Sequence, residues 1–148
     1  MNKQKIMKWA LPALLMSAMT FEIMPGSVQY YAKDPAKDLE GAWTFFTPPV
    51  EGMAGSCLPL AGVVTFAAMV LALVAACFKK GNLYKTIGWC CLGGGALSAM
   101  PYIQPVADAV VQPNVAVMLI LLVCWLLAMH MDKKKAETEG EEITGRRL

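Results

Sequence analysis

Four long apolar blocks, nearly free of charge, constrain the fold of this chain more than any other feature. A bilayer core is crossed by about 20 mostly apolar helical residues, with a range of ~17–25, and the four blocks have 17, 22, 18 and 18 residues. The stretch Val115–Met129 is apolar on every side, so it has no face for water. We therefore predict an all-α membrane protein, a bundle of four transmembrane helices at Trp9–Pro25, Cys57–Phe78, Thr86–Ile103 and Asn114–Met131.

Composition places the chain in the membrane class and excludes other classes. Hydrophobic residues make up 57% of the 148 residues and charged residues only 16%, against roughly 25% charged residues in a soluble domain. The net charge of +2 provides no field that would attract a nucleic acid. We expect one transmembrane domain over residues 1–131 and a charged tail over 132–148, a frayed helical extension that becomes solvated coil.

Basic residues are divided unevenly between the two sides of this bundle. Eleven of the 13 fall on the side of the two termini, and only Lys33 and Lys37 fall on the other. Because positively charged loops stay cytoplasmic, we expect both termini on the cytoplasmic side of a bacterial-type plasma membrane. The cluster Lys133–Lys135 should attract anionic inner-leaflet lipids. The eleven are Lys3, Lys5, Lys8, Lys79, Lys80, Lys85, Lys133, Lys134, Lys135, Arg146 and Arg147.

The first block admits two interpretations. Lys3, Lys5 and Lys8 before a short apolar core are also the layout of a secretory signal peptide. However, no clean small-x-small cleavage site follows the core, and Glu22 interrupts the apolar run. We therefore expect an uncleaved first helix, whereas cleavage would leave three spans in the same orientation.

The loop 26–56 between the first two blocks is long and aromatic. Its 31 residues exceed an ordinary connection, and Trp and Tyr are favoured both at membrane interfaces and as binding anchors. We expect a partly ordered outer loop in which Ala42–Thr47 lies on the outer mouth of the bundle. This element either packs as a lid or meets a partner. The candidate partner-binding residues are Tyr30, Tyr31, Trp43, Phe45 and Phe46.

Glu22 is the only acidic residue within an expected span. An ionisable group at membrane depth is costly when unpaired and is by default a functional candidate. Glu22 lies three residues before Pro25, about 4–5 Å from the outer end of its helix, so its side chain can also extend to water. Two roles therefore stay open, a proton or cation site and an interfacial residue.

Small residues recur at every fourth position in the second and third blocks. This spacing lets helix backbones approach closely in a membrane, so we expect these two blocks to form a closely packed antiparallel hairpin. Replacing Ala72 by Leu should then overpack the interface and lower stability. Replacing Ala128 by Leu should lower stability less, because the fourth block has no strong stripe of small residues. The expected packing residues are Ala68, Ala72, Ala76, Gly94, Gly95, Ser98 and Ala99.

The five cysteines do not have the spacing of a metal site. Cys90 and Cys124 lie at similar depth on the inner side, with His130 nearby, which would suit a soft metal. No Cys-x-x-Cys spacing occurs, however, and Cys is also an ordinary small apolar residue. We therefore expect no metal site and no cofactor.

The features along Trp9–Ala76 resemble those of small, uncharacterised bacterial four-span integral membrane proteins. They are a Lys-rich start, a first helix that ends in Met24-Pro25-Gly26, an aromatic outer segment Thr44–Pro48 and an apolar second helix. The resemblance implies the four-span fold and carries no assigned activity.

The functional expectation follows from what the spans contain. No nucleophile–base pair, metal cluster or phosphate-binding motif appears, so we expect no enzyme and no catalytic residue. The leading interpretation is a non-enzymatic accessory or interaction protein that uses its aromatic outer loop to meet a membrane-protein partner or a second copy. The alternative is a small oligomeric transporter or channel component with Glu22 and the Gly-rich third helix at its pathway, although transport requires polar groups at mid-membrane depth, of which the chain has few.

Overall fold

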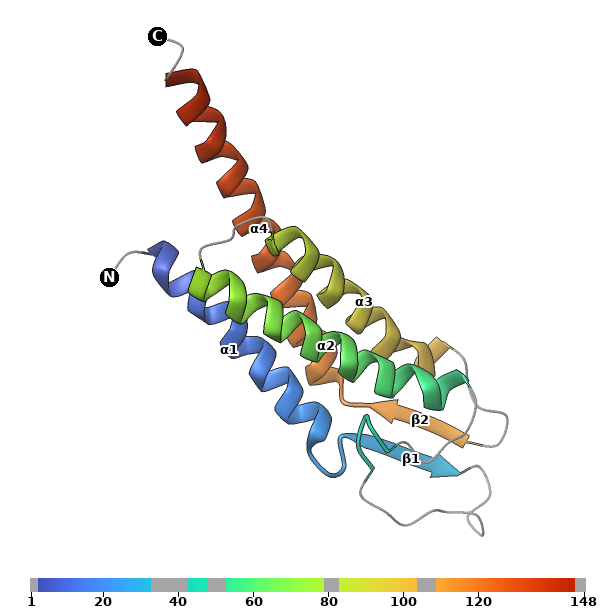
Figure 1. Ribbon diagram of the computed structural model, residues 1–148. Coiled ribbons are helices and arrows are strands. Elements are labelled where there is room, and N and C mark those ends of the chain that lie inside the picture. Colours follow the sequence, from blue (N-terminus) through green and yellow to red (C-terminus); the bar gives the residue numbers. More distant parts are fainter. Residues whose placement is uncertain (1–2, 33–42, 48–52, 79–82, 104–108, 146–148) are drawn as a thin grey trace.

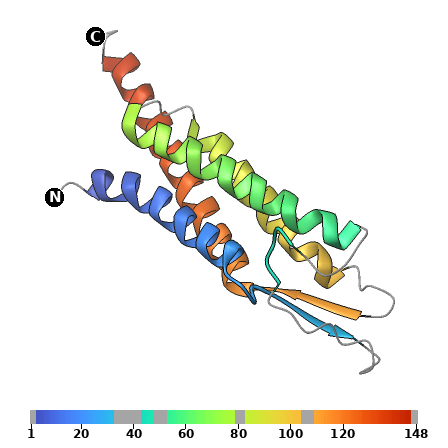
Figure 2. The ribbon, with the colours of Figure 1, turned by 60° about the horizontal axis from the view of Figure 1, so that its bottom comes forward.

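A computed structural model of the chain consists of four helices and a two-stranded sheet (Figure 1). It describes residues 3–32, 43–47, 53–78, 83–103 and 109–145. The helices run side by side, and both strands lie at one end of the bundle, which we call the ribbon end (Figure 2). The order is α1 (Lys3–Ile23), β1 (Val28–Ala32), α2 (Met53–Phe78), α3 (Leu83–Ile103), β2 (Ala109–Pro113) and α4 (Val115–Gly145).

Three of the helices have the length and apolarity of membrane spans. These segments are Ile6–Ile23, Ser56–Phe78 and Val115–Glu137. The predicted helical transmembrane protein is confirmed to that extent. The remaining helix, α3, packs against both α2 and α4, so it is part of the same bundle.

Apart from Leu58, the buried described residues of α2 have small side chains, whereas many of its large apolar side chains face outward. Ala61, Ala68 and Ala72 are buried, whereas Val63 and Phe66 are more than half exposed. A soluble helix shows the opposite arrangement, with its large apolar residues inside. Lipid tails supply no hydrophobic drive for helix association, so close packing of small residues takes its place.

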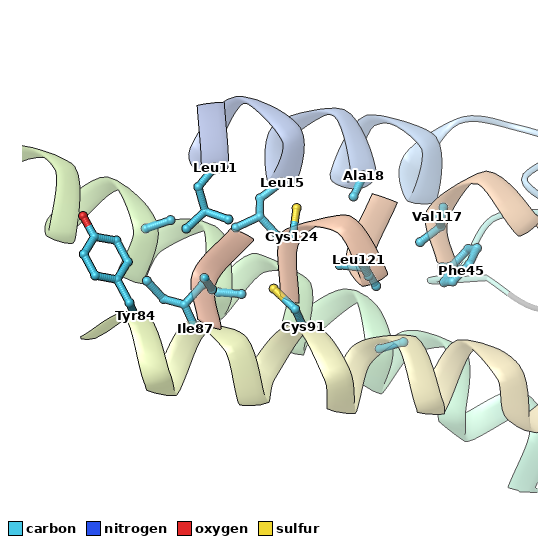
Figure 3. Close-up of a cluster of buried hydrophobic side chains, with 14 of the residues drawn as sticks. Leu11, Leu15, Ala18, Phe45, Tyr84, Ile87, Cys91, Val117, Leu121 and Cys124 are labelled. Carbon is cyan, nitrogen blue, oxygen red and sulfur yellow. The ribbon is translucent and has the colours of Figure 1, made fainter. Parts of the chain in front are cut away.

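The core lies between all four helices and continues to the ribbon end. Figure 3 shows Leu11 and Leu15 of α1 beside the side chains of α3 and α4, with Phe45 and Val117 at one end of the cluster. Phe45 is the largest of the fully buried side chains. A residue from the long loop therefore completes the core.

The sheet is the element that the all-α expectation missed. β1 and β2 pair antiparallel, from Val28 opposite Pro113 to Ala32 opposite Ala109. The chain leaves α1 at Ile23, two residues earlier than expected, and turns through Gly26, whose φ of +82° favours glycine. β1 thus follows α1 and β2 precedes α4, so both strands continue segments of the bundle.

Hydrogen bonds attach this sheet to the helices. The Asn114 amide donates to the Ser27 carbonyl over 2.8 Å, and Asn114 Oδ1 accepts from the Ala116 amide over 2.9 Å, which caps α4. The Tyr102 hydroxyl at the end of α3 donates to the Pro113 carbonyl over 2.6 Å. The sheet therefore ties α1, α3 and α4 together at the ribbon end.

The charged tail continues α4 as a helix to Gly145, whereas the sequence predicted a change to coil. Its last turns extend past the other helices (Figure 1). Several expected features lie outside the described residues. They are the outer Lys33 and Lys37, the inner connection 79–82, the remainder of the loop over 33–42 and 48–52, and Arg146 and Arg147.

Candidate ion site at Glu22

Glu22 lies on the buried face of α1. The side chains of Leu11, Leu15 and Ala18 are buried, and Glu22 continues the same stripe at the next helical repeat. Its exposed fraction is 0%. The side chain therefore does not extend to water in this structure, because its carboxyl group points into the bundle toward Thr65.

The carboxyl group of Glu22 has one hydrogen-bond partner among the described residues. Thr65 Oγ1 of α2 lies 2.9 Å from Glu22 Oε1 and 3.0 Å from the carbonyl oxygen of Ala61, and it is fully buried as well. Glu22 Oε2 is buried with no hydrogen-bond partner in the described part of the chain. A buried polar atom without a partner is unusual enough in a native structure to require an explanation.

Helix α3 approaches the Thr65 hydroxyl through a glycine. A Cβ built on Gly94 would lie 3.4 Å from Thr65 Oγ1 and 3.5 Å from Leu121 Cδ1. Ser98, one turn further along α3, is also buried and donates its hydroxyl to the Gly94 carbonyl over 2.9 Å. Glu22, Thr65 and Ser98 thus place three buried polar side chains in the ribbon half of the bundle.

A segment of the long loop, residues 43–47, covers this region, and we call it the lid. The Phe45 amide donates to the carbonyl oxygen of Glu22 over 3.1 Å, and the Trp43 carbonyl accepts from the Gly26 and Val28 amides. The lid is turned upon itself, because Thr44 Oγ1 accepts from the amides of residues 46 and 47. Its Phe45 side chain is fully buried.

The lid also contacts α2. The Phe46 ring occupies the space beside Gly62, where a Cβ would lie 2.5 Å from Cζ of the ring. The lid therefore touches both α1 and α2, the two helices that contribute Glu22 and Thr65.

The five aromatic residues proposed for partner binding have different environments. Phe45 is buried and Trp43 is half-buried, with its Nε1 lacking a partner among the described residues. Tyr30 is half-buried and packs against the core. Tyr31 and Phe46 are exposed at 52% and 39%. Of the five residues, only Tyr31 and Phe46 expose a large part of their side chains.

The expected small-residue stripe lies partly inside the bundle. Ala68, Ala72, Gly94 and Ser98 are buried, whereas the other three are half-buried. The buried face of α2 turns to Ala75 because a straight helix has 3.6 residues per turn, not four. The three half-buried residues are Ala76, Gly95 and Ala99.

The burial of Ala128 argues against the expectation that a Leu at this position would lower stability less than a Leu at Ala72. Ala128 is fully buried on α4, and a Cβ built on Gly88 would lie 3.6 Å from its Cβ. Helix α4 therefore also has a closely packed position, although its sequence shows no stripe.

Two of the inner cysteines meet in the core, but the pair differs from the expected one. Cys91 of α3 and Cys124 of α4 are buried and point toward each other in the core (Figure 3), whereas Cys90 is half-buried. His130 is exposed. Within the described ranges, no three His, Cys, Asp or Glu side chains gather as a metal site.

Comparisons with known proteins add no relative: no protein-family model, curated protein or solved structure matches the chain. A buried carboxyl group with a hydroxyl at one oxygen and no partner at the other can hold a proton or a small cation, and it can release that ion when water reaches it.

Proposed function

We propose that the chain is a four-span, multi-pass membrane protein that acts as a small transporter or channel component, with Glu22 as its ion-binding group. One observation carries the proposal: the carboxyl group of Glu22 is fully buried, and one of its two oxygens has no described partner. Ionisable groups inside membrane bundles are costly, and they mark ion pathways and proton relays.

The four-span topology is part of the proposal. α3 has 21 residues, which at ~1.5 Å per residue approaches the ~30 Å thickness of a bilayer core. Lys8, Lys85 and Lys133–Lys135 all belong to the end of the bundle opposite the sheet. Positively charged ends stay inside, so the ribbon end faces outward and both termini are cytoplasmic in a plasma membrane.

The surroundings of Glu22 support an ion site more than a purely structural role. Replacing a buried polar group by an apolar one of similar size is often neutral for stability or even favourable. The lid is hydrogen-bonded to the backbone of Glu22 and packs against α2 at Gly62, and α3 has no side chain at Gly94, where it approaches the Thr65 hydroxyl. An outer cover above a buried carboxyl group is the arrangement expected of a gated site.

The experiment is a flux measurement in vesicles that contain the purified full chain. Gradients of H⁺, Na⁺ and K⁺ are imposed in turn, and the initial flux is compared between the wild type, Glu22→Gln and Glu137→Gln. Glu137 is an exposed glutamate at the opposite end of the protein and serves as the matched control. At least one ion should move at least tenfold more slowly with Glu22→Gln and at the wild-type rate with Glu137→Gln. Equal rates in all three proteins would rule the function out.

A second candidate function is the non-enzymatic accessory or interaction protein. The observation that favours it is a pair of exposed apolar side chains, Tyr31 and Val110, which lie opposite each other in the sheet and are 52% and 41% exposed. A photo-crosslinking residue at Tyr31 should then give one adduct of defined mass in native membranes, with either a second copy or another membrane protein. The same probe at Tyr30, which lies on the other face of β1 and packs against the core, should give none.

A further inference from the structure

We propose that the ion held at Glu22 is a proton. It is bound to Oε1 and forms a hydrogen bond to the hydroxyl oxygen of Thr65. The Thr65 hydroxyl in turn donates a hydrogen bond to the carbonyl oxygen of Ala61. The proposal rests on the proposed function, because it names the ion for the same site. It makes Glu22 a neutral carboxylic acid in the closed bundle.

Thr65 has a single hydroxyl proton for two neighbouring oxygen atoms. A hydroxyl group has one proton to donate and lone pairs that accept. Thr65 Oγ1 has two oxygen neighbours within hydrogen-bond distance, Glu22 Oε1 at 2.9 Å and the Ala61 carbonyl at 3.0 Å. The carbonyl oxygen can only accept, so the Thr65 proton satisfies that contact. Both contacts are complete hydrogen bonds only when Glu22 Oε1 brings a proton of its own.

An ionised Glu22 would leave this arrangement short of donors. A carboxylate only accepts hydrogen bonds, so the single Thr65 proton would be shared between two acceptors. Oε2 would remain a charged oxygen with no described partner. In the acid form, both contacts of Thr65 are complete hydrogen bonds, and Oε2 is an uncharged carbonyl oxygen, which is much less costly to bury.

No described positive charge lies near enough to hold Glu22 as a carboxylate. Lys8 is 14 residues before it, about 21 Å along α1, and Lys85 is in the first turn of α3 at the same far end. The described lid contains no charged or titratable side chain. The charged residues and the histidine of α4, from His130 onward, lie toward the end of that helix away from the sheet. The titratable groups nearer to the ribbon end on the surrounding elements include the thiols of Cys57 on α2, Cys91 on α3 and Cys124 on α4, and the phenols of Tyr30 and Tyr31 on β1.

The ligand set also argues against a divalent metal ion. Mg²⁺ requires six ligands and Ca²⁺ six to eight, nearly all of them oxygens. The Glu22 backbone carbonyl already accepts from the Phe45 amide and from Ser27 Oγ, and the Ala61 carbonyl faces Thr65. Among the described residues, the Glu22 carboxyl group and the Thr65 hydroxyl are then left as ligands. That set suits a proton.

Release of the proton is a simple transfer to water. When water reaches Glu22, the bond between Oε1 and hydrogen breaks, its electron pair stays on Oε1, and the proton forms a new bond to the water oxygen. The products are a carboxylate and a hydronium ion, so atoms and charge balance without a further reactant. Access for water requires that the lid move, because Phe45 covers this end of α1.

The test is infrared spectroscopy of the full chain in vesicles at neutral pH. The spectrum of Glu22→Gln is subtracted from that of the wild type, with glutamate labelled in ¹³C to assign the difference. We expect the carbonyl stretch of a protonated carboxylic acid, absent from Glu22→Gln and retained in Glu137→Gln. Thr65→Val should shift this band to higher frequency because the hydrogen bond is lost, and Thr65→Ser should restore it. If Thr65→Val does not fold, the band position in Thr65→Ser is compared with that of the wild type, and the two should agree.

A carboxylate band in place of the acid band would overturn the proposal. Its failure is distinct from that of the proposed function. An ionised Glu22 together with Glu22-dependent flux of Na⁺ or K⁺ rejects the proton and keeps the transporter. An acid band without any Glu22-dependent flux supports the proton on Glu22 and rejects the transporter.

Discussion

The backbone amide of Phe45 donates a hydrogen bond to the carbonyl oxygen of Glu22 over 3.1 Å, so the lid is attached to the backbone of the residue that carries the buried carboxyl group. Ser27 Oγ donates to the same oxygen over 3.2 Å. This carbonyl belongs to the last turn of α1, where backbone oxygens lack a partner inside the helix. The same contact therefore caps the helix and positions the lid.

Phe45 should be the lid residue that matters most for stability. It is fully buried, so Phe45→Ala leaves a cavity and should lower the free energy of unfolding by about 3–5 kcal/mol. Phe46→Ala should cost less, because 39% of that side chain is already exposed. Equilibrium unfolding in a mild detergent measures both changes. Equal losses would show that Phe45 is not a core residue.

Gly62 and Phe46 should be energetically coupled. A methyl group at position 62 would collide with the Phe46 ring, so Gly62→Ala should displace that ring from α2 and destabilise the lid. In a Phe46→Ala background the same change meets no ring and should be neutral or stabilising, since Ala favours a helix over Gly by about 1 kcal/mol. A double-mutant cycle of unfolding free energies measures the coupling. Strict additivity would contradict the contact.

Two neighbouring glycines of α3 provide a matched test of the packing beside Thr65. A Cβ on Gly94 lies 3.4 Å from Thr65 Oγ1, whereas a Cβ on Gly93 has no atom within 4 Å. Gly94→Val adds two further carbons at the crowded position and should cost about 1–3 kcal/mol by overpacking. Gly93→Val makes the same chemical change in open space and should be tolerated. Thermal unfolding in detergent measures both losses of stability. Similar losses would show that they come from helix propensity and not from packing beside Thr65.

The sequence predicted the helices well because lipid requires long uncharged segments, and such segments are visible in composition alone. It also contained the signal for the site: Leu11, Leu15, Ala18 and Glu22 follow a helical repeat, which places the acid on the buried face. Distance from the helix end suggested an exposed Glu22, but the lid and the sheet cover that end.

What the sequence did not predict depends on contacts between distant segments. The two strands are separated by α2 and α3, and no local pattern reports their pairing. Thr65 is 43 residues from Glu22, and a threonine in an apolar helix is unremarkable until an acid is opposite it. The burial of Ala128 likewise depends on Gly88 of another helix.

The topology predicts which introduced cysteines are accessible in intact cells. In a variant without the five native cysteines, a membrane-impermeant thiol reagent should label a cysteine at Tyr31, which is exposed in the sheet at the ribbon end. A cysteine at Glu137, exposed on α4 at the opposite end, should react only after the membrane is opened. The reverse pattern would show that the ribbon end faces the cytoplasm.

The central claim is that the buried carboxyl group of Glu22 exchanges an ion with water, and chemical modification of the unmutated protein tests it most directly. A hydrophobic carbodiimide reacts with carboxylic acids in apolar surroundings, and a water-soluble carbodiimide reacts with exposed ones. Mass spectrometry locates the adduct, and ion flux is measured on the same vesicles. The account predicts that the hydrophobic reagent modifies Glu22 and stops the flux in proportion, and that the soluble reagent modifies Glu137 and leaves the flux unchanged. Full modification of Glu22 with undiminished flux would contradict it.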